Sequence, residues 1–193
     1  MSDDRSPTIR LSSFVGSRVY PILIPGNPRA CNPSIAVNGE GFRAIVRTVN
    51  YDLDDAGVCI SLPGGFHVSS NWLVEFDRNL MMTGLRSVDD DAVRTGDRPI
   101  PGGFEDCRLF RWKDAWWFFA SVVVDQKPIT TRMVLCRLDD ARVAECHFIS
   151  SPIQATIEKN WMPCFADDDL SWIYRIDPMQ LVHYRADGAP VMS

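Results

Sequence analysis

Apolar residues along the chain occur in short segments rich in Val, Ile, Phe, Trp and Tyr, separated by Gly, Asp, Asn or Pro. Short runs of β-branched and aromatic residues bounded by turn formers are typical of strands. The pattern predicts strands over 34–37, 42–49, 58–62, 71–76, 107–112, 116–124, 132–138, 143–149, 161–165, 170–176 and 180–184. No capping residue precedes an apolar stripe of helical spacing, so any helix should span one or two turns. The predicted fold class is all-β.

A pair of residues that opens a strand recurs three times along the chain, as Asn32-Pro33, Glu105-Asp106 and Lys159-Asn160. Each pair leads into a strand, a tight polar turn, a second strand and a third strand. A unit of about 50 residues with three or four antiparallel strands has the size of a propeller blade. We therefore expect a single partial β-propeller domain over 1–193, made of an N-terminal strand or extension (1–31), a first blade (32–82), a loop (83–103), a second blade (104–150) and a third blade (151–193).

In a propeller the starts of the innermost strands lie near the central channel, so the repeated pairs are expected to converge on one pocket. Neighbouring residues of a strand face opposite ways, which predicts that Asp106 and Arg108 enter this pocket together and that Glu105 does not. An ion pair between Asp106 and Arg108 that only stabilises the strand is the structural alternative.

Five motifs follow one another along the chain: Asn32-Pro33-Ser34-Ile35, Arg47-Thr48-Val49-Asn50-Tyr51, Gly103-Phe104-Glu105-Asp106-Cys107-Arg108-Leu109, Glu158-Lys159-Asn160-Trp161-Met162-Pro163 and Tyr174-Arg175-Ile176-Asp177-Pro178. In this order they resemble the signatures of the five-bladed propeller mannoside phosphorylases and hydrolases, glycoside hydrolase family 130. The resemblance covers about residues 31–185. It implies an enzyme that cleaves or phosphorolyses β-mannosides or related glycosides.

The resemblance implies that Asp106 is the catalytic general acid. A single carboxylate suffices for a phosphorylase, because inorganic phosphate is then the nucleophile and a co-substrate, and cations hold it. No other cofactor is expected. The residues implied to bind substrate or phosphate are Asn32, Arg47, Asn50, Glu105, Arg108, Arg132, Lys159, Asn160, Tyr174 and Arg175. The chain departs from the family in carrying Tyr174-Arg175 where phosphorylases commonly have His-Arg, and in having room for about three blades.

Two other functions fit the same pattern. One is a non-catalytic sugar-binding or assembly module, and the other is a glycosyltransferase that acts from a sugar phosphate. Three blades leave an open edge, so a homo-oligomer that closes it is expected, with 9–24 as a candidate closing strand. Most of the six tryptophans should be core, and Trp72 and Trp161 are the candidates for sugar stacking.

Charge, hydropathy and the spacing of cysteines and histidines exclude several classes of partner and ligand. The net charge is −5 with a pI near 5.1 and no basic run, so nucleic acid is not expected as a partner. The most apolar window, 115–124, is about half the length of a membrane span, and the first residues lack signal-peptide features, so we expect a cytoplasmic protein that does not bind membranes. Scattered cysteines and isolated histidines predict no metal site, and the acidic clusters at 54–55, 89–91 and 167–169 should be solvated turns.

Overall fold

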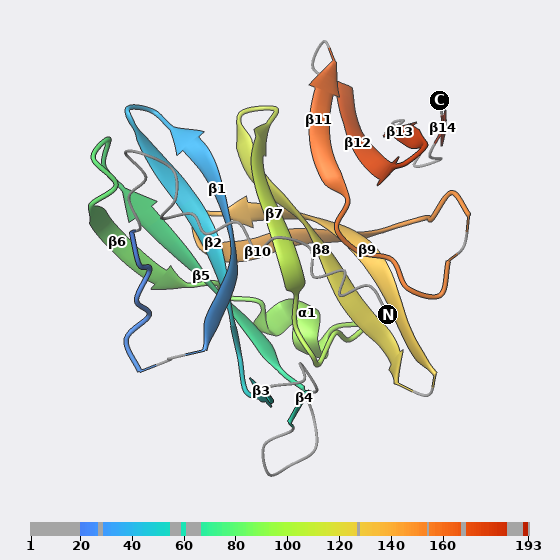
Figure 1. Cartoon of the computed structure of the whole chain (residues 1–193), viewed down its shortest axis with the longest axis horizontal. Coiled ribbons are helices and arrows are strands. Elements are labelled where there is room, and N and C mark those ends of the chain that lie inside the picture. Colours follow the sequence, from blue (N-terminus) through green and yellow to red (C-terminus); the bar gives the residue numbers. More distant parts are fainter. Residues whose placement is uncertain are drawn as a thin grey trace, which may run out of the picture.

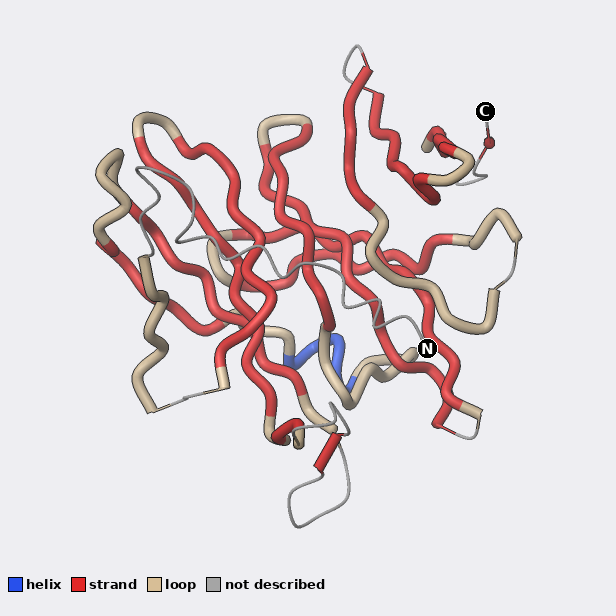
Figure 2. Tube along the Cα trace, viewed as in Figure 1, coloured by secondary structure: helices blue, strands red, loops and turns tan. Residues whose placement is uncertain are grey.

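The computed structural model describes residues 20–26, 29–54, 59–60, 67–126, 128–153, 155–166, 169–184 and 191–192. Three antiparallel sheets of four strands account for nearly all of the regular structure, as Figures 1 and 2 show. The all-β class expected from the apolar pattern is confirmed.

Each sheet is a meander in which neighbouring strands follow one another in the sheet's own order. The first sheet contains β1 (Ala30–Asn38), β2 (Gly41–Val49), β5 (Ser69–Phe76) and β6 (Met82–Ser87). The second contains β7 (Glu105–Trp112), β8 (Ala115–Gln126), β9 (Ile129–Asp139) and β10 (Arg142–Ile149). The third contains β11 (Met162–Ala166), β12 (Asp169–Ile176), β13 (Met179–His183) and β14 (Val191–Met192). Two short strands, β3 (Asp52–Leu53) and β4 (Cys59–Ile60), pair with each other between β2 and β5.

The prediction that residues 83–103 form a loop is wrong. It holds most of β6, the outer strand of the first sheet, and the helix α1 (Asp91–Thr95). An edge strand pairs on one side only, and its outward positions stay polar, so β6 lacks the apolar run by which the other strands were found. The five-residue helix agrees with the expectation of one or two turns.

Part of the predicted N-terminal closing strand, residues 9–19, lies outside the described residues, as do Asp55, Asp167 and Asp168 of the acidic clusters and positions 58, 61 and 62 of a predicted strand. The described segment 20–26 lies on the outer face of the first sheet. There Ile24 is buried in a small cluster with Ala44, Val46 and Val74. No helix in the described part of the chain has the length and hydropathy to cross a bilayer.

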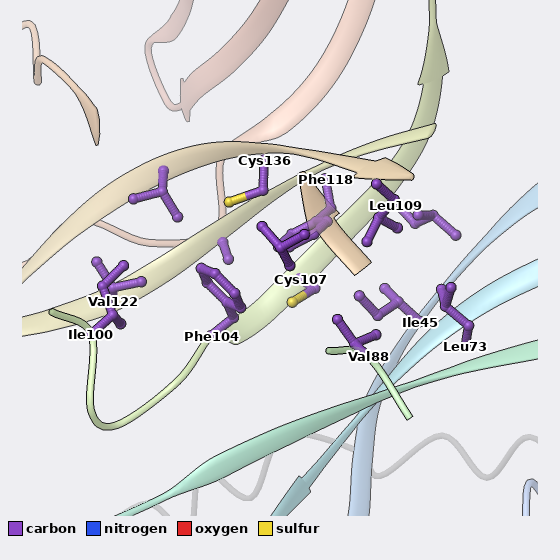
Figure 3. Packing of buried hydrophobic residues seen from close by; sticks show 14 residues of the cluster. Ile45, Leu73, Val88, Ile100, Phe104, Cys107, Leu109, Phe118, Val122 and Cys136 are labelled. Atoms are coloured by element: carbon purple, nitrogen blue, oxygen red, sulfur yellow. The ribbon is translucent and has the colours of Figure 1, made fainter. Parts of the chain in front are cut away.

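Two apolar layers join the three sheets. The first lies between the first and second sheets, where Ile45 and Leu73 meet Phe104, Cys107 and residues of β8, as Figure 3 shows. The second lies between the second and third sheets. These layers bring β1 beside β7 and β7 beside β11 (Figure 1). The first strands of the three sheets are therefore neighbours in space.

The tryptophans belong mainly to this packing. Trp161 is 1% exposed and stacks on Trp172, with ring centroids 5.1 Å apart and planes 6° from parallel. Trp72 is half-buried, and its indole N–H donates to Thr48 Oγ1 at 3.3 Å. The Trp161 ring lies in the core and is not open for a sugar to stack on, whereas Trp72 is only partly covered by the cluster around Ile24.

Candidate functional site

The three strand openings share an unusual backbone conformation. Asn32 has a φ of 46°, Asp106 of 52° and Asn160 of 62°, which places all three in the left-handed region. Asn and Asp enter this region more readily than other non-glycine residues. The register also shifts at the first two openings, between Cys31 and Ser34 and between Glu105 and Arg108. The repeat seen in the sequence is therefore a repeat of backbone geometry, and its first member is Cys31-Asn32 rather than Asn32-Pro33.

The second and third openings are each fastened to the preceding sheet through the residue two positions before the left-handed one. The carbonyl of Phe104 accepts a 3.0 Å hydrogen bond from the side-chain amide of Asn71. The carbonyl of Glu158 accepts hydrogen bonds from Ser121 Oγ at 2.9 Å and Thr131 Oγ1 at 2.8 Å. Buried polar groups of one sheet thus hold the chain where the next sheet begins.

Arg47 is the centre of the polar cluster between the first two sheets. Its side chain is 6% exposed, its Nη2 lies 2.7 Å from Glu105 Oε1, and its Nη1 lies 3.1 Å from Asp106 Oδ1. Nε donates to Ser69 Oγ at 2.8 Å, and Nη2 also donates to the Tyr51 hydroxyl at 3.2 Å. Both carboxylates of the pair therefore meet one guanidinium.

The prediction that Glu105 and Asp106 point to opposite sides is wrong. The left-handed backbone of Asp106 and the register shift beside it break the strict alternation of a regular strand. Burial lowers the pKa of Arg47, but the neighbouring carboxylates, Glu105 first, outweigh it, so that the pKa is raised overall. Arg47 is accordingly a permanent cation already engaged by two carboxylates.

Asp106 is held on one oxygen and open on the other. Oδ1 accepts from Arg47 and, at 2.5 Å, from the Asn32 amide. No residue in the described part of the chain donates a hydrogen bond to Oδ2, and the side chain is 18% exposed. Asp106 therefore has a fixed orientation and an oxygen that a ligand can reach.

Arg108 does not pair with Asp106, so the structural ion pair considered for these two residues does not form. Its Nη2 donates instead to Asn160 Oδ1 at 3.1 Å, which links the openings of the second and third sheets. Its Nε is buried and has no hydrogen-bond partner within the described ranges. A buried guanidinium N–H without an acceptor is costly, so an enclosed water would be stabilised at this atom.

Lys159 stands beside Asn160 and is exposed; among the described residues it has neither a hydrogen bond nor an ion pair. The preceding Glu158 is 3% exposed. Its carboxylate holds the opening of the third sheet in place. Its carboxylate accepts hydrogen bonds from Ser151, from the Tyr174 hydroxyl at 3.0 Å and from the Trp161 indole at 3.2 Å. Burial raises the pKa of the Tyr174 hydroxyl, and the bond to Glu158 adds to that rise. Tyr174 thus supports the opening through Glu158.

Three predicted site residues have other contacts. Arg132 donates to the backbone carbonyls of Thr131 at 2.8 Å and Ala155 at 3.2 Å. Asn50 accepts a 2.8 Å hydrogen bond from the backbone N–H of Val68 and so closes the connection between β2 and β5. Arg175 is exposed on β12, beside a register shift. Arg132 therefore supports the 150s loop.

Tyr51 and Ser69 join the cluster although neither was predicted. The Tyr51 ring packs on His67 with centroids 4.8 Å apart and planes at 42°, and its hydroxyl meets Arg47. Tyr51 stands four residues after Arg47 in one of the five motifs, which is the signal that could have identified it. Cys31 lies within electrostatic reach of Arg47 and Asp106, and burial raises the pKa of its thiol.

The charges divide the site into two parts. Arg47 faces two carboxylates, so this part carries one unbalanced negative charge. Arg108 and Lys159 supply positive charge on the side of the third sheet. The described residues contain no group of three His, Cys, Asp or Glu placed to hold a metal ion. The arrangement can bind hydroxyl groups, move a proton at Asp106 and hold an anion beside Arg108.

No protein-family model matches this sequence, and no curated protein matches it either. The case for a function therefore depends on the motifs and on the geometry of the site.

Proposed function

We propose that the three sheets are consecutive blades of a β-propeller of the glycoside hydrolase family 130 kind, and that the chain cleaves or phosphorolyses β-mannosides or related glycosides. The observation that carries this proposal is the state of Asp106, whose Oδ1 is held by Arg47 and Asn32 while Oδ2 stays open. A positioned carboxyl with one accessible oxygen is what a general acid requires.

In the proposed reaction a proton on Asp106 passes to the glycosidic oxygen as the bond from that oxygen to the sugar C1 breaks. The contacts from Arg47 and Asn32 to Oδ1 fix the orientation of the Asp106 carboxyl for this transfer. Phosphate then forms the new bond to C1, or water forms it and returns its proton to Asp106, which the first step left as a carboxylate. Arg108 and Lys159 are the cations left to hold a phosphate, because Arg47 is engaged by Glu105 and Asp106.

The test is an assay on a β-mannoside with a sugar leaving group, with and without inorganic phosphate, for wild type and for Asp106→Asn. Asp97→Asn is the matched control, since Asp97 is an exposed carboxylate without a hydrogen bond or ion pair to the described residues. We expect product release by wild type and by Asp97→Asn, and its loss in Asp106→Asn. Dependence on phosphate identifies a phosphorylase, and independence a hydrolase.

A second candidate is a non-catalytic sugar-binding module. It is favoured by the ion pairs of Arg47, since an arginine between two carboxylates also joins the first two sheets whether or not any chemistry takes place. Sugar binding by calorimetry without turnover in either direction, including from mannose 1-phosphate, would establish this candidate and refute the enzyme.

The proposed partners are an oligosaccharide or glycoside substrate and a second copy of this chain. The third sheet exposes four large apolar side chains, Met162, Phe165, Ile176 and Met179. Large exposed apolar groups on one sheet favour association. Light scattering at tens of micromolar tests this, and a stable monomer would contradict it.

A further inference from the structure

A cavity of about 490 Å³ lies beside the turn that joins β7 to β8, at the opposite end of β7 from Asp106. The described residues that line it are Arg111, Trp112, Lys113, Asp114 and Phe165. Phe165 belongs to β11 and contacts Phe110 of β7 with ring centroids 5.6 Å apart, so the cavity lies where the second and third sheets meet. Its volume is within the range of small-molecule sites.

Lys113 is a poor choice for the backbone of this turn. Lys113 has a φ of 48° and Asp114 of 58°, so both central residues of the hairpin are left-handed. Such a two-residue turn favours Asn-Gly or another glycine pair. A left-handed conformation costs an ordinary residue about 1 kcal/mol. The turn would be more stable with Asn or Gly in place of Lys113, which makes the Lys113 side chain a candidate for a role beyond the turn.

The cation of Lys113 is held in place over an aromatic ring. Its Nζ lies 4.5 Å from the Trp112 centroid. The Trp112 ring is in turn fixed by edge contacts with Trp117, at 5.3 Å, and Tyr184, at 6.0 Å. A lysine is normally a flexible surface group, and the contact with the indole limits that freedom. Among the described lining residues, Lys113 and Arg111 supply two cations and Asp114 one carboxylate, in a chain whose net charge is −5. Arg111 Nη2 lies 3.8 Å from Asp114 Oδ1, so Lys113 is the cation without an ion pair among them.

We propose that this cavity is a second ligand site and that it binds an acidic saccharide, one that carries a hexuronic acid. The C–H face of the sugar ring lies on Phe165, which is 47% exposed. The sugar carboxylate meets Lys113 and Arg111, and Asp114 accepts hydrogen bonds from the ring hydroxyls. The site is independent of the reaction proposed at Asp106, because no residue is shared between them.

The test is a titration of the whole chain with trigalacturonic acid and with a neutral trisaccharide, followed by calorimetry and tryptophan fluorescence. Trigalacturonic acid should bind at least about tenfold more tightly than the neutral sugar, with affinity that falls as salt rises. Lys113→Asn should weaken binding by about tenfold or more while the melting temperature stays the same or rises, since Asn suits the turn. Lys113→Arg, which keeps the cation, should retain most of the affinity.

Asp106→Asn separates this proposal from the one before it, because that change should abolish turnover and leave trigalacturonic acid binding unaltered. An equal affinity for the acidic and neutral sugars, or an unaltered affinity in Lys113→Asn, would overturn the proposal. Failure of both sugars to bind at millimolar concentration would overturn it as well.

Discussion

Replacing Arg47 by Met tests whether the cluster between the first two sheets stabilises the fold. The guanidinium is 6% exposed, and its removal leaves Glu105 and Asp106, 27% and 18% exposed, close together without a cation. Removing one partner of a fully buried ion pair costs about 3–5 kcal/mol. Because these carboxylates keep some contact with water, we expect a loss of about 2–3 kcal/mol. For a chain of this size that lowers the melting temperature by about 4–12 °C.

The assay for Arg47→Met is urea unfolding followed by tryptophan emission, which reports on the buried Trp161 and Trp172. Adding Glu105→Gln to Arg47→Met removes one of the unbalanced charges and should restore about 1 kcal/mol. Arg142→Met is the control, because its ion pair with Asp139 is exposed and should be worth less than about 1 kcal/mol. An Arg47→Met variant within about 0.5 kcal/mol of wild type, or a double variant without recovery, would refute the reasoning.

Three further predictions concern the supports of the site and the thiols. Gly103→Ala should cost at least about 2 kcal/mol in thermal unfolding, because φ is +73° and the added Cβ would lie 2.3 Å from the carbonyl oxygen of Ser69; an unchanged melting temperature would contradict this. Glu158→Ala should cost about 2–4 kcal/mol in urea unfolding, since three donors lose their acceptor, and a loss below about 0.5 kcal/mol would show that this anchor is dispensable. Iodoacetamide at neutral pH should label Cys146 before Cys136, because the hydrogen bond from Cys136 lowers the pKa of Cys146 whereas burial raises that of Cys136; the reverse order in peptide mapping would count against the thiol contact.

The sequence predicted the strands well where a strand has a neighbouring strand on both sides and carries many apolar side chains. β8 and β9 are inner strands of the second sheet, and their apolar runs are continuous. It failed at β6, where one free edge lets polar residues fill the pattern. The position of each strand opening was found to within one residue, because Asn and Asp mark the left-handed positions that the turns require.

The arrangement of the site was harder to predict. Period-two alternation assigns Glu105 and Asp106 to opposite faces, and one left-handed residue cancels that rule. Arg47 was identified as a site residue, but its two carboxylate partners belong to the next sheet. A contact between residues so far apart in the sequence cannot be predicted from the spacing of residues along one strand. Likewise, Arg108 and Asn160 lie on neighbouring sheets and meet only after the second apolar layer has formed.

The most direct test of the central claim compares two mannoside substrates in the Asp106→Asn variant. One substrate has an aryl leaving group that departs without a proton, and the other has a sugar leaving group that needs one. If Asp106 is the general acid, the variant loses about 10²–10⁴-fold in rate on the sugar-linked substrate and much less on the aryl substrate. Full activity of Asp106→Asn on the sugar-linked substrate would contradict the assignment.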